Sequence, residues 1–266
     1  MYDKLRGRSY ESNVANVASE RYFYDFPPEI VAEGADPQLI DKELSRMETA
    51  FADALAGFLL SVDEGRAIDA RQRTVMAIFV ATQALRTREH RVLGEQLART
   101  ILAPLQADGV AIDLPDTSLT QAVLIFHPFV RDVLIPVLFN HIWIVGQNDT
   151  PAQLYTSDSP VVRSAHEQDP FLSYAGLGIK GIEIALPLTP RHVLVLCERT
   201  SFAHLAERDG STVTLNEDHV TYYNTLQVAE SYRQVYCPCD DFSLAEEICD
   251  RLPDLRSPDR PRIITK

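Results

Sequence analysis

Two stretches of the chain combine strand-like apolar residues with the small polar residues and prolines that could furnish a site. Leu-Tyr-Thr-Ser-Asp-Ser-Pro-Val-Val occupies residues 154–162, and Ile-Glu-Ile-Ala-Leu-Pro-Leu-Thr-Pro occupies residues 182–190. Apolar runs that end in Ser, Thr, Asp and Pro are typical of strands that open into turns. Polar side chains at such strand ends often line binding pockets. We therefore expect the functional site at these two strand ends.

Asp158 and Glu183 are the carboxylates that the two stretches offer. A pair of carboxylates can bind a divalent metal ion, and either one can act as a general base. We therefore name both as candidate catalytic residues and metal ligands. Asp158 also has a simpler interpretation, an Asx-turn in which its side chain accepts nearby backbone N–H groups before Pro160, and this is the commoner use of Asp before Pro. Glu183 could equally lie on the exposed face of an alternating strand.

An Asp on one strand and a Glu on a later strand resemble the acidic skeleton of the PD-(D/E)xK nucleases. In those enzymes both carboxylates bind a metal ion and a lysine assists. Here Ala185 stands where that lysine is expected, and Lys180 precedes the Glu instead. The resemblance is therefore limited to the two acidic positions.

A second candidate group follows a wholly apolar stretch of a predicted helix. At about 100° per residue, its members Gln83, Arg86, Thr87 and His90 share one helical face. An Arg beside such a stretch needs a partner. That partner could be the phosphate or carboxylate of a ligand, or it could be a structural ion pair, with Asp158 as a candidate. The candidate ligand-binding residues of this region are Gln83, Arg86, His90 and Arg91.

The residues before position 143 favour helices. Apolar side chains recur at three- and four-residue steps over 39–58, and a second helix is predicted over 69–102. Residues 118–142 form another apolar helical region, interrupted by Pro128 and Pro136, where a helix bends or breaks. Before these helices, the alternating aromatic residues of 22–26 indicate a short strand.

The residues after position 142 favour short strands with tight connections, which is the pattern of an antiparallel sheet. Residues 216–231 then indicate a late helix. The predicted fold class is α+β, with a helical N-terminal half followed by a mostly antiparallel β-sheet on which the late helix packs. We divide the chain into a mainly helical region with a short N-terminal strand (1–142), a β-rich region (143–252) and a loose tail (253–266), together forming one compact unit.

Composition narrows the classes of function. The net charge of −13 over 266 residues argues against sequence-independent binding to nucleic acid or to an anionic membrane. The longest apolar run, 75–81, is far shorter than the roughly 18 residues of a membrane span, and no signal-peptide pattern is visible. We therefore predict a cytoplasmic protein with reduced thiols. Cys237 and Cys239 are too closely spaced for a zinc knuckle and are interpreted as structural.

Five segments in a fixed order resemble a bacterial family, the domain of unknown function 4238 family. They are residues 18–24, residues 83–87 with Arg91, residues 156–162, residues 186–190, and Asn224 ahead of Val235-Tyr236. The resemblance adds Asn224 to the candidate ligand-binding residues. Members of the family usually begin with a His-x-x-Pro-x-x-Tyr-Leu segment, which does not occur in this chain. Either the chain lost that segment, its start was assigned late, or it is a divergent member. If the histidine matters to the family's chemistry, we expect this chain to lack that activity.

Two functions remain open at this point. The first is a metal-assisted enzyme that acts on a phosphate-containing substrate, nucleic acid included. In this hypothesis Asp158 and Glu183 hold a divalent metal ion while Arg86 and Arg91 bind phosphate. The alternative is a non-catalytic binding or interaction module, for example a regulatory or defence-associated one. The expected partner is a small anionic ligand or nucleic acid, with no membrane attachment and an open oligomeric state.

Overall fold

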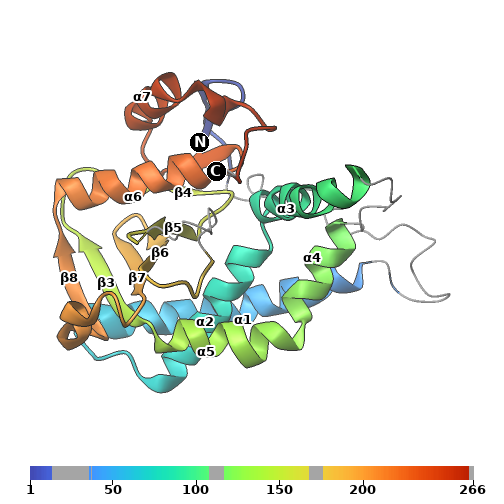
Figure 1. Cartoon of the computed structure of the whole chain (residues 1–266). Helices are drawn as coiled ribbons and strands as arrows, with labels where there is room; N and C mark the ends of the chain where they lie inside the picture. Colours follow the sequence, from blue (N-terminus) through green and yellow to red (C-terminus); the bar gives the residue numbers. More distant parts are fainter. Residues whose placement is uncertain (14–35, 37, 108–116, 168–175, 264–266) are drawn as a thin grey trace.

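A five-stranded sheet separates two layers of helices (Figure 1). The computed structural model describes residues 1–13, 36, 38–107, 117–167 and 176–263. The sheet has the order β5-β6-β7-β3-β8, and its strands are β3 (Ile142–Asn148), β5 (Val162–Ala165), β6 (Ile182–Thr189), β7 (His192–Cys197) and β8 (Ser211–Leu215). Helix α6 (Glu217–Glu230) covers one face. The predicted α+β class, with a late helix packed on the sheet, is confirmed.

The sheet is antiparallel from β5 through β6 and β7 to β3. The outermost strand, β8, instead runs parallel to β3, and the chain reaches it through η3 (Ala203–Arg208). The β6–β7 connection is a tight turn at residues 190–191, as the Thr-Pro-Arg-His sequence predicts. The alternation of the strands gives the sheet two buried faces. Ile184 and Leu186 contact the lower helices, whereas Ala185 contacts the α6 side.

The N-terminal helices are α1 (Leu39–Asp63), α2 (Ala70–Leu85), α3 (Arg88–Ala107), α4 (Thr117–Phe126), the π-helical segment η2 (Val130–Leu134) and α5 (Ile135–Asn140). Among them, α1, α2 and α5 form the lower layer, whereas α3 lies to one side, at the level of α6 (Figure 1). The single helix predicted over 69–102 is wrong, because it breaks at Arg86 and Thr87. Thr87 acts as the N-cap of α3, since its Oγ1 accepts the backbone N–H of His90 at 3.2 Å.

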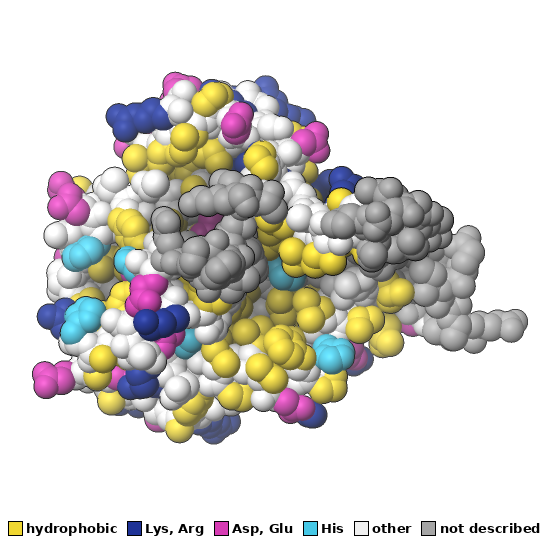
Figure 2. Space-filling view, in the orientation of Figure 1, with side chains coloured by type: hydrophobic (Ala, Val, Ile, Leu, Met, Phe, Trp, Pro, Cys, Tyr) yellow, Lys and Arg dark blue, Asp and Glu magenta, His cyan; other side chains and the backbone are white. Residues whose placement is uncertain are grey.

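The apolar region after residue 117 belongs partly to the core. Pro128 separates α4 from η2, whereas Pro136 lies in the first turn of α5, where a missing N–H is tolerated. Leu138 is buried against the sheet, while Phe126 and Phe129 stay exposed. Figure 2 shows hydrophobic side chains gathered on the surface over α4 and α5. In the described part of the chain, no single helix is long and apolar enough to cross a membrane. One bent pair, 119–126 with 130–140, meets that test by length and composition only.

A second, smaller sheet lies above α6 and holds the beginning of the chain. It has the order β2-β1-β9-β4 and consists of β1 (Tyr2–Asp3), β2 (Arg8–Ser9), β4 (Thr156–Ser157) and β9 (Gln234–Tyr236). Helix α7 (Ser243–Arg251) packs on it through a separate apolar cluster. The short strand predicted over residues 22–26 lies outside the described residues.

The C-terminal segment, predicted to be loose from residue 253, is held against α3 as far as it is described. After η4 (Pro253–Arg256), the side chains of Arg260 and Arg262 both pair with Glu89, at 2.9 Å each. Gln96 in α3 adds two bonds to the backbone of this segment: its Nε2 donates to the carbonyl of Arg260, and its Oε1 accepts the N–H of Arg262. The segment therefore joins the two halves of the molecule.

Candidate functional site

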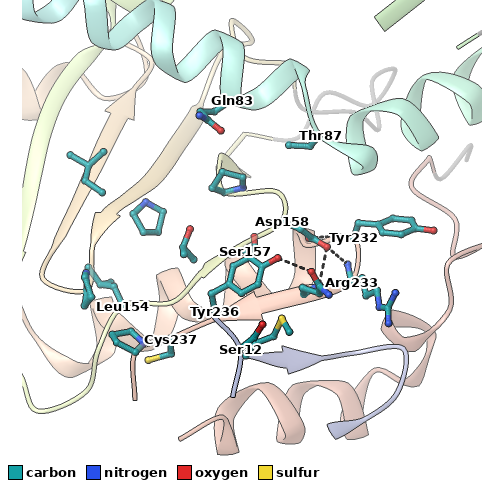
Figure 3. A pocket seen from close by; sticks show the side chains of 18 of the residues that line it. Ser12, Gln83, Thr87, Leu154, Ser157, Asp158, Tyr232, Arg233, Tyr236 and Cys237 are labelled. Carbon is teal, nitrogen blue, oxygen red and sulfur yellow. Dashed lines mark hydrogen bonds between the residues drawn. The ribbon is translucent and has the colours of Figure 1, made fainter. Parts of the chain in front are cut away.

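A cleft of about 1360 Å³ lies where the smaller sheet, the end of β6 and the helices α1 and α2 meet (Figure 3). Both stretches that the sequence singles out contribute to its lining. The first supplies Leu154, residues 156–158 and Pro160, and the second supplies residues 187–190. Residues of α1 and Gln83 and Arg86 at the end of α2 also line the cleft, and residues 232–234 and 236–240 line it beside the first stretch, with which β9 pairs.

Asn224 in α6 fixes the beginning of the first stretch. Its Oδ1 accepts the backbone N–H of Tyr155 at 2.7 Å, and its Nδ2 donates to the carbonyl oxygen of Gln153 at 2.9 Å. The side chain is buried and does not line the cleft. Asn224 therefore has a positioning role, and its predicted contact with a ligand is not part of the structure.

Two further side chains of α6 continue this support at three-residue intervals. Gln227 accepts the hydroxyl of Ser157 at 2.7 Å and donates to the carbonyl of Pro160 at 2.8 Å. Glu230 accepts the backbone N–H of Arg163 at 2.7 Å and pairs with its guanidinium at 3.4 Å. Three successive turns of one helix face thus support the segment from Gln153 to Arg163, in addition to its pairing with β9.

Asp158 is half-buried in the cleft and receives three backbone N–H groups (Figure 3). Its Oδ1 accepts from Tyr232 at 2.9 Å, and its Oδ2 accepts from Arg233 at 2.8 Å and Gln234 at 2.9 Å. Burial raises the pKa of this carboxyl to about 6, although these three bonds and the charge of Lys4 act in the opposite direction. The Asx-turn interpretation correctly expects the Asp158 side chain to accept backbone N–H groups. Its partners are wrong, however, because the three donors lie over 70 residues away in the sequence.

Glu183 does not share the cleft with Asp158. It is buried on the α6 face of the sheet, where its Oε2 bonds His166 Nε2 at 2.9 Å and its Oε1 has no hydrogen-bond partner among the described residues. Among the residues that the structure describes, no group of three or more His, Cys, Asp or Glu side chains is arranged to hold a metal ion. The two-carboxylate arrangement predicted for Asp158 and Glu183 is therefore not formed at the cleft.

The helix break at Thr87 divides the second candidate group. Arg86 lines the cleft and forms an ion pair with Glu48 of α1, which lines it too. His90 and Arg91 belong to α3 and do not line the cleft. Burial, with a smaller effect of a neighbouring arginine, lowers the pKa of His90 to about 4, so this ring is neutral near pH 7. Arg91 donates through Nε to Gln121 at 2.9 Å, which braces the junction of the two helices.

Gln83 is the buried polar side chain of the cleft that has no partner among the described residues. It is 9% exposed and lies at the cleft with its amide directed inward (Figure 3). Its side chain makes no hydrogen bond within the described part of the chain, and its amide atoms are not fully enclosed, so they face the space of the cleft. Gln121 is a useful contrast, since its buried amide donates to the carbonyls of Leu85 and Thr87 at 2.7 and 2.8 Å. The Gln83 amide is thus left for a bound molecule or for water.

Several cleft residues were not anticipated from the sequence. Arg88 lies over the ring of Tyr232 at 4.9 Å, and Arg233 pairs with the fully buried Asp3. Cys237 and Cys239, interpreted as structural, also line the cleft. The sequence carries no local signal for these positions, because they reach the cleft through contacts between distant parts of the chain.

A protein-family model, described as "Protein of unknown function (DUF4238)", matches residues 1–238. The match covers well over half of the chain and includes both stretches that line the cleft. The chain therefore belongs to this family, as its sequence segments predict. No curated protein matches the chain, and neither does any solved structure.

Proposed function

We propose that the cleft binds a small phosphate-bearing molecule. The observation that carries this proposal is the amide of Gln83, which has no partner among the described residues and lines the same cleft as the guanidinium of Arg86. A binding site typically combines an apolar lining with a few polar groups that fix the orientation of the ligand. Here Gln83 would supply that orientation, and Arg86 would supply a fork of N–H donors suited to phosphate.

A ligand phosphate at Arg86 would compete with the carboxylate of Glu48. The side chains of Arg86 and Glu48 are 29% and 51% exposed, and such a partly exposed pair contributes at most about 1 kcal/mol. A phosphate group can therefore replace the Glu48 carboxylate at little cost. The lining also contains Glu11, Asp41 and Asp240, which would repel the continuous backbone of a nucleic acid. This charge pattern favours a single small phosphate ester over a polymer.

Matched substitutions of the two ion-pair partners test the binding proposal. Titration calorimetry with pyrophosphate and with adenine and guanine nucleotides is expected to detect binding to the wild type. Arg86→Gln should weaken it at least about tenfold, the loss of one charge-assisted hydrogen bond, whereas Glu48→Gln should strengthen it. Arg46→Gln and Glu43→Gln change the same charges at an exposed pair on α1 and should leave binding unchanged. Equal affinities of Arg86→Gln and the wild type would contradict the proposal.

A second candidate function is hydrolysis of the bound ester, and Asp158 supports it. A carboxyl group whose pKa is raised to about 6 inside a cleft is suited to proton transfer near neutral pH. Metal assistance belongs to this candidate, with Asp158 as the only predicted ligand that lines the cleft. Turnover of the same phosphate esters with and without Mg²⁺ or Mn²⁺ tests it. Asp158→Asn should then abolish turnover while Glu183→Gln retains it, and turnover that survives in Asp158→Asn rules the candidate out.

A further inference from the structure

A hydroxyl, an imidazole and a carboxylate follow one another at the turn between β6 and β7. Thr189 Oγ1 lies 3.1 Å from His192 Nδ1, and His192 Nε2 lies 3.4 Å from Asp63 Oδ1. Thr189 lines the cleft, whereas His192 and Asp63 do not. A hydroxyl that contacts a base, which in turn contacts a third group, is the arrangement by which proteins activate a nucleophile.

An irregularity in the sheet turns Thr189 toward the cleft. Pro187 pairs with Val193 and Thr189 with His192, so that Leu188 is an extra residue on β6. The side chains of an undistorted strand point alternately to its two faces, yet all four residues from 187 to 190 line the cleft. A bulge of this kind changes the direction of a side chain and is frequent beside active sites.

The hydrogen bonds of Thr189 determine where its proton lies. Its Oγ1 accepts the backbone N–H of Arg191 at 3.1 Å and that of His192 at 3.0 Å. With both lone pairs in use, the hydroxyl donates its own proton to Nδ1, and the neutral imidazole carries its proton on Nε2. The two backbone N–H groups also stabilise the oxyanion that remains when the hydroxyl loses its proton.

Asp63 is placed to stabilise the protonated imidazole. Nε2 of His192 is buried and has no hydrogen bond within the described part of the chain, and the Asp63 carboxylate lies just beyond normal hydrogen-bond distance. Contacts of this kind often shorten only when a substrate is bound. Asp63 is also the last residue of α1, and the C-terminal end of a helix favours a nearby positive charge.

We propose that Thr189, His192 and Asp63 cleave a small carboxylic ester held in the cleft. Thr189 Oγ1 attacks the carbonyl carbon while its proton passes to His192 Nδ1. The ester carbon–oxygen bond then breaks, and the alcohol leaves with that proton. Water attacks the acyl-threonine, returns a proton to Oγ1 through His192 and releases the acid. One ester and one water thus give one acid and one alcohol, and no phosphate group takes part.

Acyl labelling of the full-length folded protein tests this activity. The protein is mixed with p-nitrophenyl acetate, quenched in acid and digested with trypsin. Cleavage after Lys180 and Arg191 releases peptide 181–191, in which Thr189 carries the only hydroxyl, thiol, amine or imidazole side chain. We expect an acetyl group on this peptide, because an activated ester acylates faster than the acyl-enzyme is hydrolysed. Release of p-nitrophenolate should be at least about tenfold faster than in buffer.

Substitutions separate the roles of the three residues. Thr189→Ser should keep the acetylated peptide and Thr189→Val should lose it. Asp63→Asn changes an exposed side chain and should lower kcat at least about tenfold with KM unchanged. Thr214→Val, at an exposed position of β8 outside the cleft, is the control that should retain the wild-type rate.

Two results would overturn the proposal: peptide 181–191 of the wild type without an acetyl group, or a wild-type kcat in Asp63→Asn. Neither depends on Thr189→Val, which also removes the acceptor of two N–H groups in the turn and whose folding is checked by circular dichroism. Because the probe is a neutral ester, the outcome is independent of whether the cleft binds phosphate.

Discussion

The side chain of Asn224 holds the backbone around Tyr155 as a neighbouring strand would, accepting its N–H at 2.7 Å while donating to the carbonyl of Gln153 at 2.9 Å. A side chain of helix α6 thereby makes the two backbone hydrogen bonds that a neighbouring strand would make. The wall of the cleft that contains Asp158 follows directly from this point. Its geometry depends on α6 even though Asn224 never reaches the cleft.

Removing this amide should destabilise the protein. Asn224→Ala leaves a buried N–H and a buried carbonyl unpaired, and we expect the free energy of unfolding to fall by about 2–4 kcal/mol. Urea denaturation followed by circular dichroism measures the change. Thr221→Ala, at an exposed position one turn earlier in α6, should stay within about 0.5 kcal/mol of the wild type. If the two variants are equally stable, the Asn224 bonds do not hold the wall.

Substitution of Gln83 should raise the stability of the protein and weaken the binding of a ligand. Gln83→Met replaces a buried amide that has no partner in the described part of the chain with an apolar side chain of similar shape, so it should raise the free energy of unfolding by about 1 kcal/mol. The same change should weaken phosphate-ester binding, because the amide is proposed to orient the ligand. Chemical denaturation and calorimetry on one preparation measure both effects.

Gln121→Met is the control for that substitution. It removes a buried amide that donates to Leu85 and Thr87, so it should cost about 2–4 kcal/mol. The residue does not line the cleft, so ligand affinity should be preserved in the folded fraction. A loss of stability in Gln83→Met comparable to that in Gln121→Met would mean that the Gln83 amide is satisfied within the protein.

The fold class could be predicted because its evidence is local. Apolar periodicity over 39–58 and alternation after residue 142 depend on near neighbours, and both correspond to elements of the structure. The helix break at Thr87 also had a local signal, a capping threonine followed by Glu89 in the next turn. The longer helical pattern on both sides of Thr87 nevertheless led to the prediction of one continuous helix over 69–102.

The site was harder to predict because its partners are distant in the sequence. Asp158 belongs to a turn-like segment, yet its three donors lie at residues 232–234. Glu183 stands on a strand that reaches the cleft, but its alternation turns it to the α6 face. Residue type and strand position identified the right segments, whereas the direction of each side chain depended on tertiary pairing.

Glu89 should be important for joining the C-terminal segment to α3. It pairs with Arg260 and Arg262, whose side chains are only 7% and 5% exposed. Glu89→Gln leaves both buried guanidinium groups without a counter-charge, and we expect a loss of about 3 kcal/mol. Guanidinium chloride would screen this effect, so urea is the appropriate denaturant.

Glu247→Gln provides the matched exposed case. Its partner is Arg251 in α7, and the two side chains are 53% and 76% exposed, so its loss should change stability by less than about 0.5 kcal/mol. Comparable effects of Glu89→Gln and Glu247→Gln would show that the last described residues contribute little to the folded state.

Lys4 should make stability depend on alkaline pH. Its Nζ is buried and donates to the carbonyls of Val228 and Ser231 at 2.6 and 2.7 Å, and burial lowers its pKa to about 7. Between about pH 7 and the unfolded value of about 10.4, the unfolded lysine binds more protons than the folded one. Stability from this group therefore rises with pH across that window, with an upper limit of about 1.4 kcal/mol per pH unit.

The difference between wild type and Lys4→Met isolates this effect from the other titrating groups. Urea unfolding at a series of pH values from about 7 to about 9.5 should show the wild type gaining on the variant by about 1 kcal/mol per pH unit. Lys42→Met removes an exposed lysine that pairs with Asp36, so its difference from the wild type should be flat over the same range. Parallel curves for wild type and Lys4→Met would mean that Lys4 keeps its charge in the folded protein, held by the two carbonyls at the end of α6.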